Sequence, residues 1–282
     1  MSKTAVALGS FDGLHIAHQK VLKSALSRCE NAVCLSFVRP PAADSIGFKG
    51  VLMQPEIKRK MLYEMGFYKV ELLEFQKVKH LSAGEFLDYI KEKFDPAALC
   101  CGYNYTFGKN REGTAKTIAE YCKANGIESV ISEQVTSFGS AVSSQRIREM
   151  VEQGDIETAN ALLSRELFFE QTVQHGDMRG RTIGFPTVNQ QLPGGFVVPK
   201  FGVYASHVTA GGKVYRGVTN IGIRPTFRLD NPLCETYIIG ADGDMYGKNL
   251  TLSLYKFIRP ERKFDSLEEL QQQIEKDRNA AL

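Results

Sequence analysis

The chain has 282 residues, of which 43% are hydrophobic and 24% are charged, so it is long enough for about two globular domains with buried cores. Its 35 Lys and Arg residues exceed its 32 Asp and Glu residues by 3, which suits small anionic ligands and is too weak to indicate nucleic acid or an acidic membrane. No apolar run has membrane-spanning length, the N-terminus lacks a signal-peptide pattern, and the six cysteines show no C-x-x-C spacing, which together predict a cytoplasmic protein with reduced thiols.

The first half alternates between short apolar runs and helical patterns. Residues 4–8 (TAVAL) predict a strand, which breaks at a glycine turn over residues 9–13 and is followed by a helix. Further apolar runs lie at 32–37, 69–75, 97–102 and 129–135, and helical patterns at 54–65, 82–94, 114–125 and 143–153. This α/β order predicts a doubly wound parallel sheet with helices on both faces and ligands at the carboxyl ends of the strands. Ser82 and Glu85 have the spacing of a capping box for one of these helices.

Two histidines stand at the start of the first predicted helix, directly after the glycine turn. Because residues three apart share a helix face, His15 and His18 would present their imidazoles together, beside the backbone N–H groups of the helix N-terminus. Such a pair can hold triphosphate oxygens and stabilise charge on a transferring phosphorus. The alternative is structural: a solvated pair, or one histidine that caps the helix and one that packs.

From about residue 166 onward the pattern changes to short β-rich runs separated by Gly and Pro. The runs are FFEQTVQ, TVNQQL, GVYASHV, KVYRGVTNIGI, CETYIIG and LTLSLYKFI. Several short strands with turn signals indicate a β-barrel or a β-sandwich, and of these we predict a small antiparallel barrel. We therefore predict an α/β domain over residues 1–165 and a barrel domain over residues 166–282.

A helix is predicted at the end of the chain. Ser266 and Glu269 have the spacing of a second capping box, which would open this helix. The pattern that follows places Leu267, Leu270, Ile274 and Arg278 on one face.

A glycine-rich segment begins the second half. Its glycines let backbone N–H groups approach an anion, because no Cβ stands in the way. They are Gly176, Gly180 and Gly184. If Pro186 begins a strand, Thr187 and Asn189 lie on the same face and offer two oxygens to a hard cation such as Mg²⁺. The alternative is a β-turn rich in Gly and Pro with a solvated arginine.

The first half resembles the FMN adenylyltransferase domain of the bacterial bifunctional riboflavin kinase/FAD synthetases. Residues 9–19 (GSFDGLHIAHQ) are similar to the family segment G-x-F-D-G-x-H-x-G-H, residues 143–148 (SSQRIR) to S-S-T-R-I-R, and residues 103–108 (YNYTFG) to D/N-F-x-F-G. The resemblance implies that His15 and His18 contact ATP phosphates and that the other motif residues form the nucleotide site. These implied ATP-binding residues are Gly9, Phe11, Asp12, Gly13, Asn104, Ser143, Ser144 and Arg146.

The second half resembles the riboflavin kinase domain of the same family over most of its length. The family's P-T-A-N is present as PTVN at residues 186–189, and further matches are GVYA at 202–205, NIGIRPTF at 220–227 and IRPERKF at 258–264. The resemblance implies that Thr187 and Asn189 bind Mg²⁺ and that Glu235 is the base for the riboflavin 5′-hydroxyl. Without the family, Glu235 would be interpreted as a solvated strand glutamate. The turn residues that would cover the nucleotide are Gly176, Gly180, Arg181 and Gly184.

The two resemblances together imply an enzyme of flavin cofactor synthesis that uses Mg²⁺ and ATP. Its second domain would phosphorylate riboflavin to FMN. Its first domain would adenylylate FMN to FAD and release pyrophosphate. Its partners would be these small molecules, with neither nucleic acid nor membrane, and the sequence leaves the oligomeric state open.

Three departures from the family motifs keep narrower functions open. Ala17 replaces the glycine of H-x-G-H, Gln145 replaces a threonine, and residues 37–41 (FVRPP) lack the histidine of F-x-P-H-P. One alternative is therefore a riboflavin kinase with a degenerate N-terminal domain. A second alternative is a flavin- or nucleotide-binding regulator without turnover.

Overall fold

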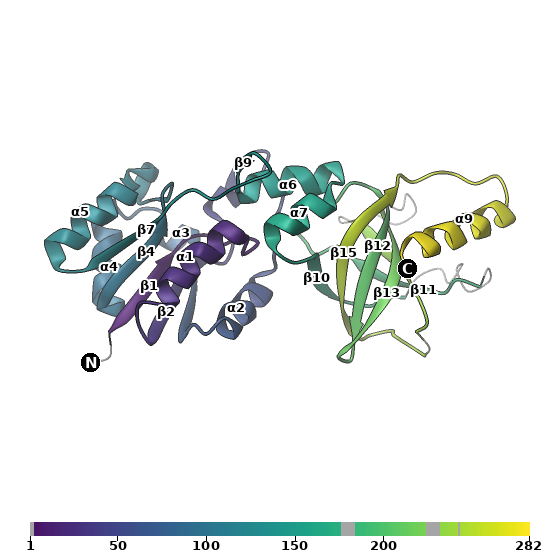
Figure 1. Cartoon of the computed structure of the whole chain (residues 1–282), viewed down its shortest axis with the longest axis horizontal. Coiled ribbons are helices and arrows are strands. Elements are labelled where there is room, and N and C mark those ends of the chain that lie inside the picture. The colour runs from purple at the N-terminus through teal and green to yellow at the C-terminus, as the bar shows by residue number, and fades with distance from the viewer. Residues whose placement is uncertain (1–2, 176–183, 224–231, 242) are drawn as a thin grey trace. The chain divides into compact units, whose positions relative to one another are not determined.

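The structure is a computed structural model that describes residues 3–175, 184–223, 232–241 and 243–282 (Figure 1). The chain forms two compact units, residues 1–144 and 145–282. The predicted domain boundary lies later, at residue 165. The prediction assigns two helices to the first domain, whereas their contacts assign them to the second unit. These are α6 (Ser144–Gln153), apart from its first residue, and α7 (Ile156–Leu163). Within the described ranges, no helix is long and apolar enough to cross a membrane.

The first unit is built on a five-stranded parallel sheet with the order β3-β2-β1-β4-β7. Its strands are β1 (Thr4–Leu8), β2 (Asn31–Phe37), β3 (Lys69–Leu73), β4 (Pro96–Gly102) and β7 (Glu128–Ser132). The chain adds β2 and β3 on one side of β1 and then crosses to add β4 and β7 on the other, so the topology switches between β1 and β4. Sheets of this kind bind ligands at the carboxyl ends of the strands beside the switch point. The predicted parallel sheet is confirmed.

Four helices lie at predicted positions: α1 (Ile16–Leu26), α2 (Pro55–Glu64), α4 (Ala83–Phe94) and α5 (Ala115–Asn125). The short helix α3 (Phe75–Val78) was not predicted, and single 3₁₀ turns lie at Pro41–Asp44 and Lys109–Arg111. Two short hairpins join β5 (Thr106–Phe107) to β6 (Gly113–Thr114) and β8 (Thr136–Ser137) to β9 (Ser140–Ala141). The predicted capping box of α4 is confirmed, because Ser82 Oγ accepts from Glu85 N at 3.3 Å and Glu85 Oε2 accepts from Ser82 N at 2.7 Å.

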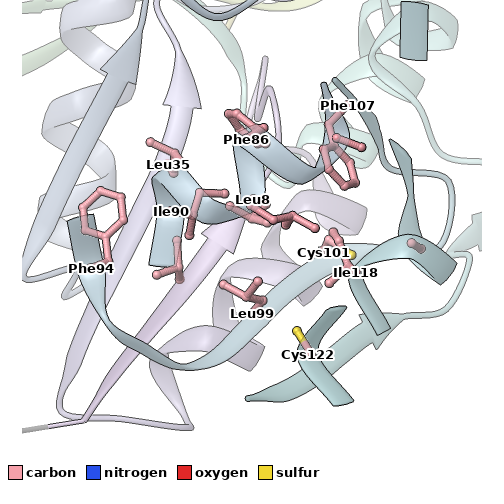
Figure 2. Packing of buried hydrophobic residues seen from close by; sticks show 14 of the residues in the cluster. Leu8, Leu35, Phe86, Ile90, Phe94, Leu99, Cys101, Phe107, Ile118 and Cys122 are labelled. Atoms are coloured by element: carbon pink, nitrogen blue, oxygen red, sulfur yellow. The ribbon is translucent and has the colours of Figure 1, made fainter. Parts of the chain in front are cut away.

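The two faces of the parallel sheet carry side chains of different size. One face packs large residues against α4 and α5 in the cluster of Figure 2, which includes Leu8, Leu35, Leu99, Phe86, Ile90 and Ile118. On β1 the residues that alternate with Val6 and Leu8 are Ala5 and Ala7, which are small and fully buried. Helix α1 packs against β1 and β4. Since small side chains allow a close approach, the alternation along β1 helps to determine which helix covers which face.

The second unit is a six-stranded antiparallel sheet with the order β10-β15-β12-β13-β14-β11. Its strands are β10 (Leu167–Thr172), β11 (Thr187–Gln191), β12 (Gly202–Ala210), β13 (Lys213–Gly222), β14 (Leu233–Ile238) and β15 (Asn249–Arg259). The two ends of this order meet, because Gln174 N, just beyond β10, donates to Asn189 O of β11 at 2.8 Å. The side chain of Gln190 adds bonds from Nε2 to Gln171 O at 2.7 Å and to Leu250 O at 2.9 Å. The predicted antiparallel barrel is confirmed.

Helix α7 is attached to the barrel through one asparagine. Asn160 Nδ2 donates to Leu254 O of β15 at 2.8 Å, and Asn160 Oδ1 accepts from Leu167 N of β10 at 2.7 Å. One side chain therefore satisfies backbone groups on two adjacent strands. This contact explains why α7 groups with the second unit.

The terminal helix α9 (Leu267–Ala280) covers the outer face of β12 and β13. Ser266 Oγ accepts from Glu269 N at 3.1 Å, as predicted, but Glu269 Oε2 accepts from Asp265 N, so only half of the predicted capping box is described. Leu267, at the first helical position, is 62% exposed, so the face that it shares with Leu270 and Ile274 is not covered at the start of the helix. Leu270 and Ile274 do turn toward the barrel, where both line a pocket.

A buried ion pair attaches α9 to the end of β15. Asp277, which is 2% exposed, accepts bonds from Arg259 Nε at 3.1 Å and from Arg259 Nη2 at 2.8 Å. Gln273 Nε2 donates to the same carboxylate at 2.7 Å. Breaking a buried pair is costly because the remaining charge keeps its desolvation penalty without its partner.

We expect Asp277→Ala to lower the free energy of unfolding by about 2–4 kcal/mol, since it leaves the Arg259 guanidinium without its carboxylate. Glu275→Ala on the same helix is the matched control, because it removes only an exposed pair with Arg278 and should cost less than about 1 kcal/mol. Urea unfolding of both variants measures the difference. Equal losses in the two variants would show that the Arg259 pair does not attach the helix.

Candidate active sites

The glycine turn after β1 is shaped by contacts that require glycine. A Cβ on Gly9 would lie 2.7 Å from the Phe11 ring, so a larger residue there would displace that ring. Phe11 and Gly13 both have positive φ, at 45° and 85°, and Phe11 is 1% exposed. The turn therefore buries an aromatic ring in a conformation that non-glycine residues seldom adopt.

The turn delivers the two histidines in direct contact. His15 is the N-cap of α1, is 3% exposed, and its Nδ1 accepts from His18 N at 3.3 Å. The two imidazole rings stack with centroids 3.5 Å apart, and the Phe11 ring lies perpendicular to the His18 ring with centroids 5.4 Å apart. An imidazole whose Nδ1 accepts a hydrogen bond carries its proton on Nε2, so His15 Nε2 is a donor at the positive end of α1. One histidine is thus both a cap and a member of the pair.

Asp12 and the Ser143–Ser144 segment meet at the same turn. Asp12 is 2% exposed, and its Oδ1 accepts from Leu52 N at 3.0 Å. Ser144 Oγ donates to Asp12 O at 2.9 Å, although the two residues are 132 positions apart. Ser143 directly precedes Ser144 and is partly buried. Two of the segments that the resemblance assigns to the nucleotide site are therefore joined by this bond within the first unit.

The remaining predicted residues of this half lie at different positions. Asn104 follows β4 on the surface, where a Cβ on Gly102 would be 3.4 Å from its Oδ1. Because β4 pairs with β1, Asn104 and the glycine turn follow neighbouring strand ends. Arg146 lies on α6 and belongs to the second unit.

A buried lysine contacts the glycine turn from α2. Lys58 is 2% exposed, and its Nζ donates to Ser10 O at 3.3 Å and to Phe37 O. Burial is the main cause that lowers the pKa of Lys58, and the Asp12 carboxylate opposes this shift. The sequence analysis missed this residue. The signal was a lysine four residues before Leu62, on the buried stripe of α2.

The barrel places the predicted metal ligands and base in adjacent rows. Thr187 and Asn189 share one face of β11, as predicted, with Asn189 only 4% exposed. The antiparallel register sets Asn189 opposite Glu235 on β14, and Glu235 opposite Asn220 on β13. Directly paired residues have Cβ atoms about 4.5–5.5 Å apart. A carboxylate is therefore flanked by two amides across three strands, an arrangement that the sequence alone did not reveal.

A pocket of about 280 Å³ opens between this face and α9. Its sheet wall includes Thr187, Asn220 and Glu235, and its opposite wall includes Leu270 and Ile274. The rim carries Phe264, whose ring lies 5.7 Å from the Arg259 guanidinium and 4.6 Å from that of Arg262. The pocket thus combines an apolar side, an aromatic rim and a polar sheet face.

Glu261 connects the rim to the polar row. Asn220 Nδ2 donates to Glu261 Oε1 at 3.1 Å. A Cβ on Gly222 would lie 2.3 Å from the same Oε1, so glycine is needed for the carboxylate to approach the strand. The segment after β15 is thereby held beside Glu235.

A second pocket, of about 270 Å³, meets the first at two shared residues, Thr187 and Tyr237. It is also lined by Asp244, Met245 and Tyr246. The Tyr246 ring stacks on His175 with centroids 4.0 Å apart. Two pockets that share a threonine suit a site where two substrates meet.

One atom of the metal-binding prediction stands out. Asn189 Oδ1 is buried and has no hydrogen-bond partner among the described residues. Gly176, Gly180 and Arg181 of the predicted nucleotide turn lie outside the described residues, whereas Gly184 is exposed with φ at 81°. A buried carbonyl oxygen without a donor is a typical ligand for a hard cation.

Comparisons with known proteins divide the chain in the same sense. Residues 1–146 match the family model for FAD synthetase, and residues 163–282 match the model for riboflavin kinase. A bifunctional riboflavin kinase/FMN adenylyltransferase of Bacillus subtilis is 35% identical over 100% of this chain and 92% of its own length. The proteins of that description from Listeria monocytogenes and Escherichia coli are 34% and 30% identical, and each alignment covers 96% of this chain and about nine-tenths of the relative.

A solved structure from Streptococcus pneumoniae has the same fold. It is 30% identical, and its alignment has a TM-score of 0.89 and covers 99% of this chain and 94% of that chain. It is named a macrolide-efflux protein. That name differs from the two family models, which match the two halves of this chain separately and agree with relatives aligned along nearly its whole length. The chain belongs to the family of bifunctional riboflavin kinase/FMN adenylyltransferases.

Proposed function

We propose that the chain catalyses both reactions of its family: ATP phosphorylates riboflavin in the second unit, and ATP adenylylates FMN in the first. The observation that carries the kinase assignment is the row of Asn189, Glu235 and Asn220 beside Thr187, where two pockets meet. This arrangement brings a carboxylate, two oxygen ligands and space for two substrates together. The substrates are small molecules, and six free cysteine thiols fit a reducing cytoplasm.

Glu235 acts on the riboflavin 5′-hydroxyl. Its carboxylate accepts the proton as the hydroxyl oxygen bonds to the γ-phosphorus of ATP, and the bond from that phosphorus to the bridging oxygen of ADP breaks. Such a transfer depends mainly on alignment and on neutralised charge, so an ordinary carboxylate is sufficient. The pocket under α9 receives the flavin ring against Leu270, Ile274 and Phe264. The adjoining pocket beside Tyr246 receives part of the nucleotide.

Thr187 and Asn189 would hold Mg²⁺ in this site. The fit rests on the buried Asn189 Oδ1, which has no donor among the described residues, and on a threonine oxygen that shares its face. Amide and hydroxyl oxygens suit this ion, which also keeps waters and substrate phosphates as ligands. When bound, Mg²⁺ would neutralise charge on the phosphates.

The histidine pair serves the second reaction. An FMN phosphate oxygen bonds to the α-phosphorus of ATP, and pyrophosphate leaves. His15 and His18 donate to the phosphate oxygens beside the N-terminal N–H groups of α1, where negative charge is stabilised. Ser144 holds the turn through Asp12, and Asn104 lies at the next strand end.

A riboflavin kinase without adenylylation is the second candidate. It is favoured by Ala17 and by the exposed Arg39 and buried Pro40 at the end of β2, where the family motif has a histidine. An incubation with riboflavin, ATP and Mg²⁺, with riboflavin, FMN and FAD resolved over time, separates the two candidates. Accumulation of FAD supports both activities, whereas a reaction that ends at FMN supports the kinase alone.

Separate substitutions of Glu235 and of the histidine pair test the assignment of the two sites. Glu235→Gln should lower FMN formation at least about 100-fold, because the 5′-hydroxyl loses its proton acceptor, while adenylylation of supplied FMN stays within about twofold. The double variant His15→Ala, His18→Ala should show the reverse pattern, since only pyrophosphate release needs the imidazoles. Both activities are followed in each protein by chromatography of the flavins. Loss of both activities in a folded single-site variant would contradict the separation.

Replacement of Asn189 tests the metal ligand. Asn189→Ala should raise the Mg²⁺ concentration for half-maximal FMN formation at least about tenfold, because a ligand oxygen is lost. Asn189→Asp, which keeps an oxygen at that position, should respond to Mg²⁺ more like the unmodified protein. Titration of Mg²⁺ in the kinase assay measures this, with adenylylation of supplied FMN as the internal reference. An unchanged Mg²⁺ response in the alanine variant would remove Asn189 from the site.

A further inference from the structure

Lys58 is a buried cation for which the proposed reactions so far have no role. Lysine is almost never fully buried unless its ammonium is paired, because the charge loses its hydration. Lys58 is 2% exposed, and it lies in the first turn of α2, a helix that otherwise turns Ile57 and Leu62 inward. A methionine of similar length would avoid the desolvation penalty. The lysine therefore needs an explanation in its contacts.

Its contacts join two strands beyond the end of their pairing. The register of β1 with β2 ends at Leu8 and Leu35. After that point Lys58 Nζ donates to Ser10 O at 3.3 Å and to Phe37 O, one carbonyl from each strand's continuation. Beyond the last β1–β2 pair, the ammonium thus donates to carbonyl groups that the pairing of these two strands does not reach. This place is the carboxyl edge of the sheet, where α/β sheets bind ligands.

The Ser10 carbonyl is held from two sides. Ser36 Oγ donates to it at 2.9 Å, and Ser36 is 1% exposed. Ser10 directly precedes Phe11, whose backbone has φ at 45° and whose ring forms a T-shaped pair with that of His18. The orientation of one carbonyl is therefore connected through a single residue to the histidine pair.

The charge of Lys58 also suits this place. Its ammonium is attracted to Asp12, whose carboxylate is buried in the same turn and accepts from Leu52 N. Burial lowers the pKa of Lys58, and Asp12 counteracts this, as does the neighbouring Cys34 thiol, whereas Arg59 acts in the same direction as burial. Positive charge near the turn favours an anionic ligand over a neutral one.

We propose that Lys58 is a positioning residue for adenylylation: it fixes the Ser10 carbonyl, and with it the glycine turn and Phe11, so that His15 and His18 meet the phosphates. This proposal rests on the proposed adenylylation site. It differs from a purely structural role, in which Lys58 would affect only the stability of the first unit. A misplacement of about 1 Å in a catalytic group can cost about 100-fold in rate.

The experiment compares Lys58→Met, Lys58→Arg and Ser36→Ala in the full chain, with Lys60→Met as the control on the exposed side of α2. Pyrophosphate release from FMN and ATP gives kcat and KM for adenylylation. Riboflavin phosphorylation in the same preparations is the internal reference, and urea unfolding reports stability.

We expect Lys58→Met to lower kcat for adenylylation about 30–100-fold while riboflavin phosphorylation stays within about twofold. Lys58→Arg keeps donors and charge and should recover part of the rate. Ser36→Ala removes the other donor to the Ser10 carbonyl and should lower kcat about 3–10-fold. Lys60→Met should match the unmodified protein in both assays.

Adenylylation at the normal rate in Lys58→Met would overturn the proposal. If that variant fails to fold, a normal kcat in Ser36→Ala would overturn it, because the carbonyl's second support would then be irrelevant. A lower stability with unchanged kcat and KM would show a structural role only. If the unmodified protein releases no pyrophosphate, the proposed adenylylation itself fails. That result differs from one in which the unmodified protein is active and the Lys58 variants release pyrophosphate at the same rate, which would contradict only the role of Lys58.

Discussion

The pairing of β14 with β11 and β13 decides which side chains face the proposed kinase pocket. A shift by one residue would send Glu235 into the barrel and bring Thr236 out. The barrel interior opposes such a shift, because Ser206, Thr219 and Thr236 form a chain of buried hydroxyls with oxygens 2.8 Å apart. Buried hydroxyls that lose their partners are destabilising. The same register therefore satisfies the hydrogen bonds of the interior and presents the proposed reactive row of Asn189, Glu235 and Asn220 outside.

The first unit solves a similar problem with a parallel sheet. There the proposed reactive groups, His15 and His18, do not lie on the strands themselves. They come from the turn and the helix that follow β1. A parallel edge leaves carbonyl groups beyond its last pair, and those of Ser10 and Phe37 are satisfied by a lysine from a third segment. The proposed kinase site thus depends on strand register, whereas the proposed adenylylation site depends on the hydrogen bonds that fix a turn.

Local patterns in the sequence predicted much of this arrangement. Periods of two and 3.6 residues predicted the alternation of strands and helices and the common face of Thr187 and Asn189. The spacing of Ser82 and Glu85 predicted the cap of α4. The pattern did not reveal that Leu267 is exposed, because the first turn of a helix can project beyond the surface that the rest covers. The contacts of Lys58 were not predictable in this way, since they join residues 48 and 21 positions apart. The flanking of Glu235 by two amides required the strand register as well.

The strand that carries the proposed metal ligands also closes the barrel. Asn189 offers its side chain to the site while its backbone oxygen accepts from Gln174 N at 2.8 Å, and Gln190 next to it bonds to two further strands. A local opening of this seam would release the edge of β11, which carries both ligand oxygens, from β10 without unfolding the rest of the barrel. Substrate bound there would hold the seam shut. Amide hydrogen exchange along β10 and β11 would then slow in proportion to occupancy, which makes the closure of the barrel a reporter of the kinase site.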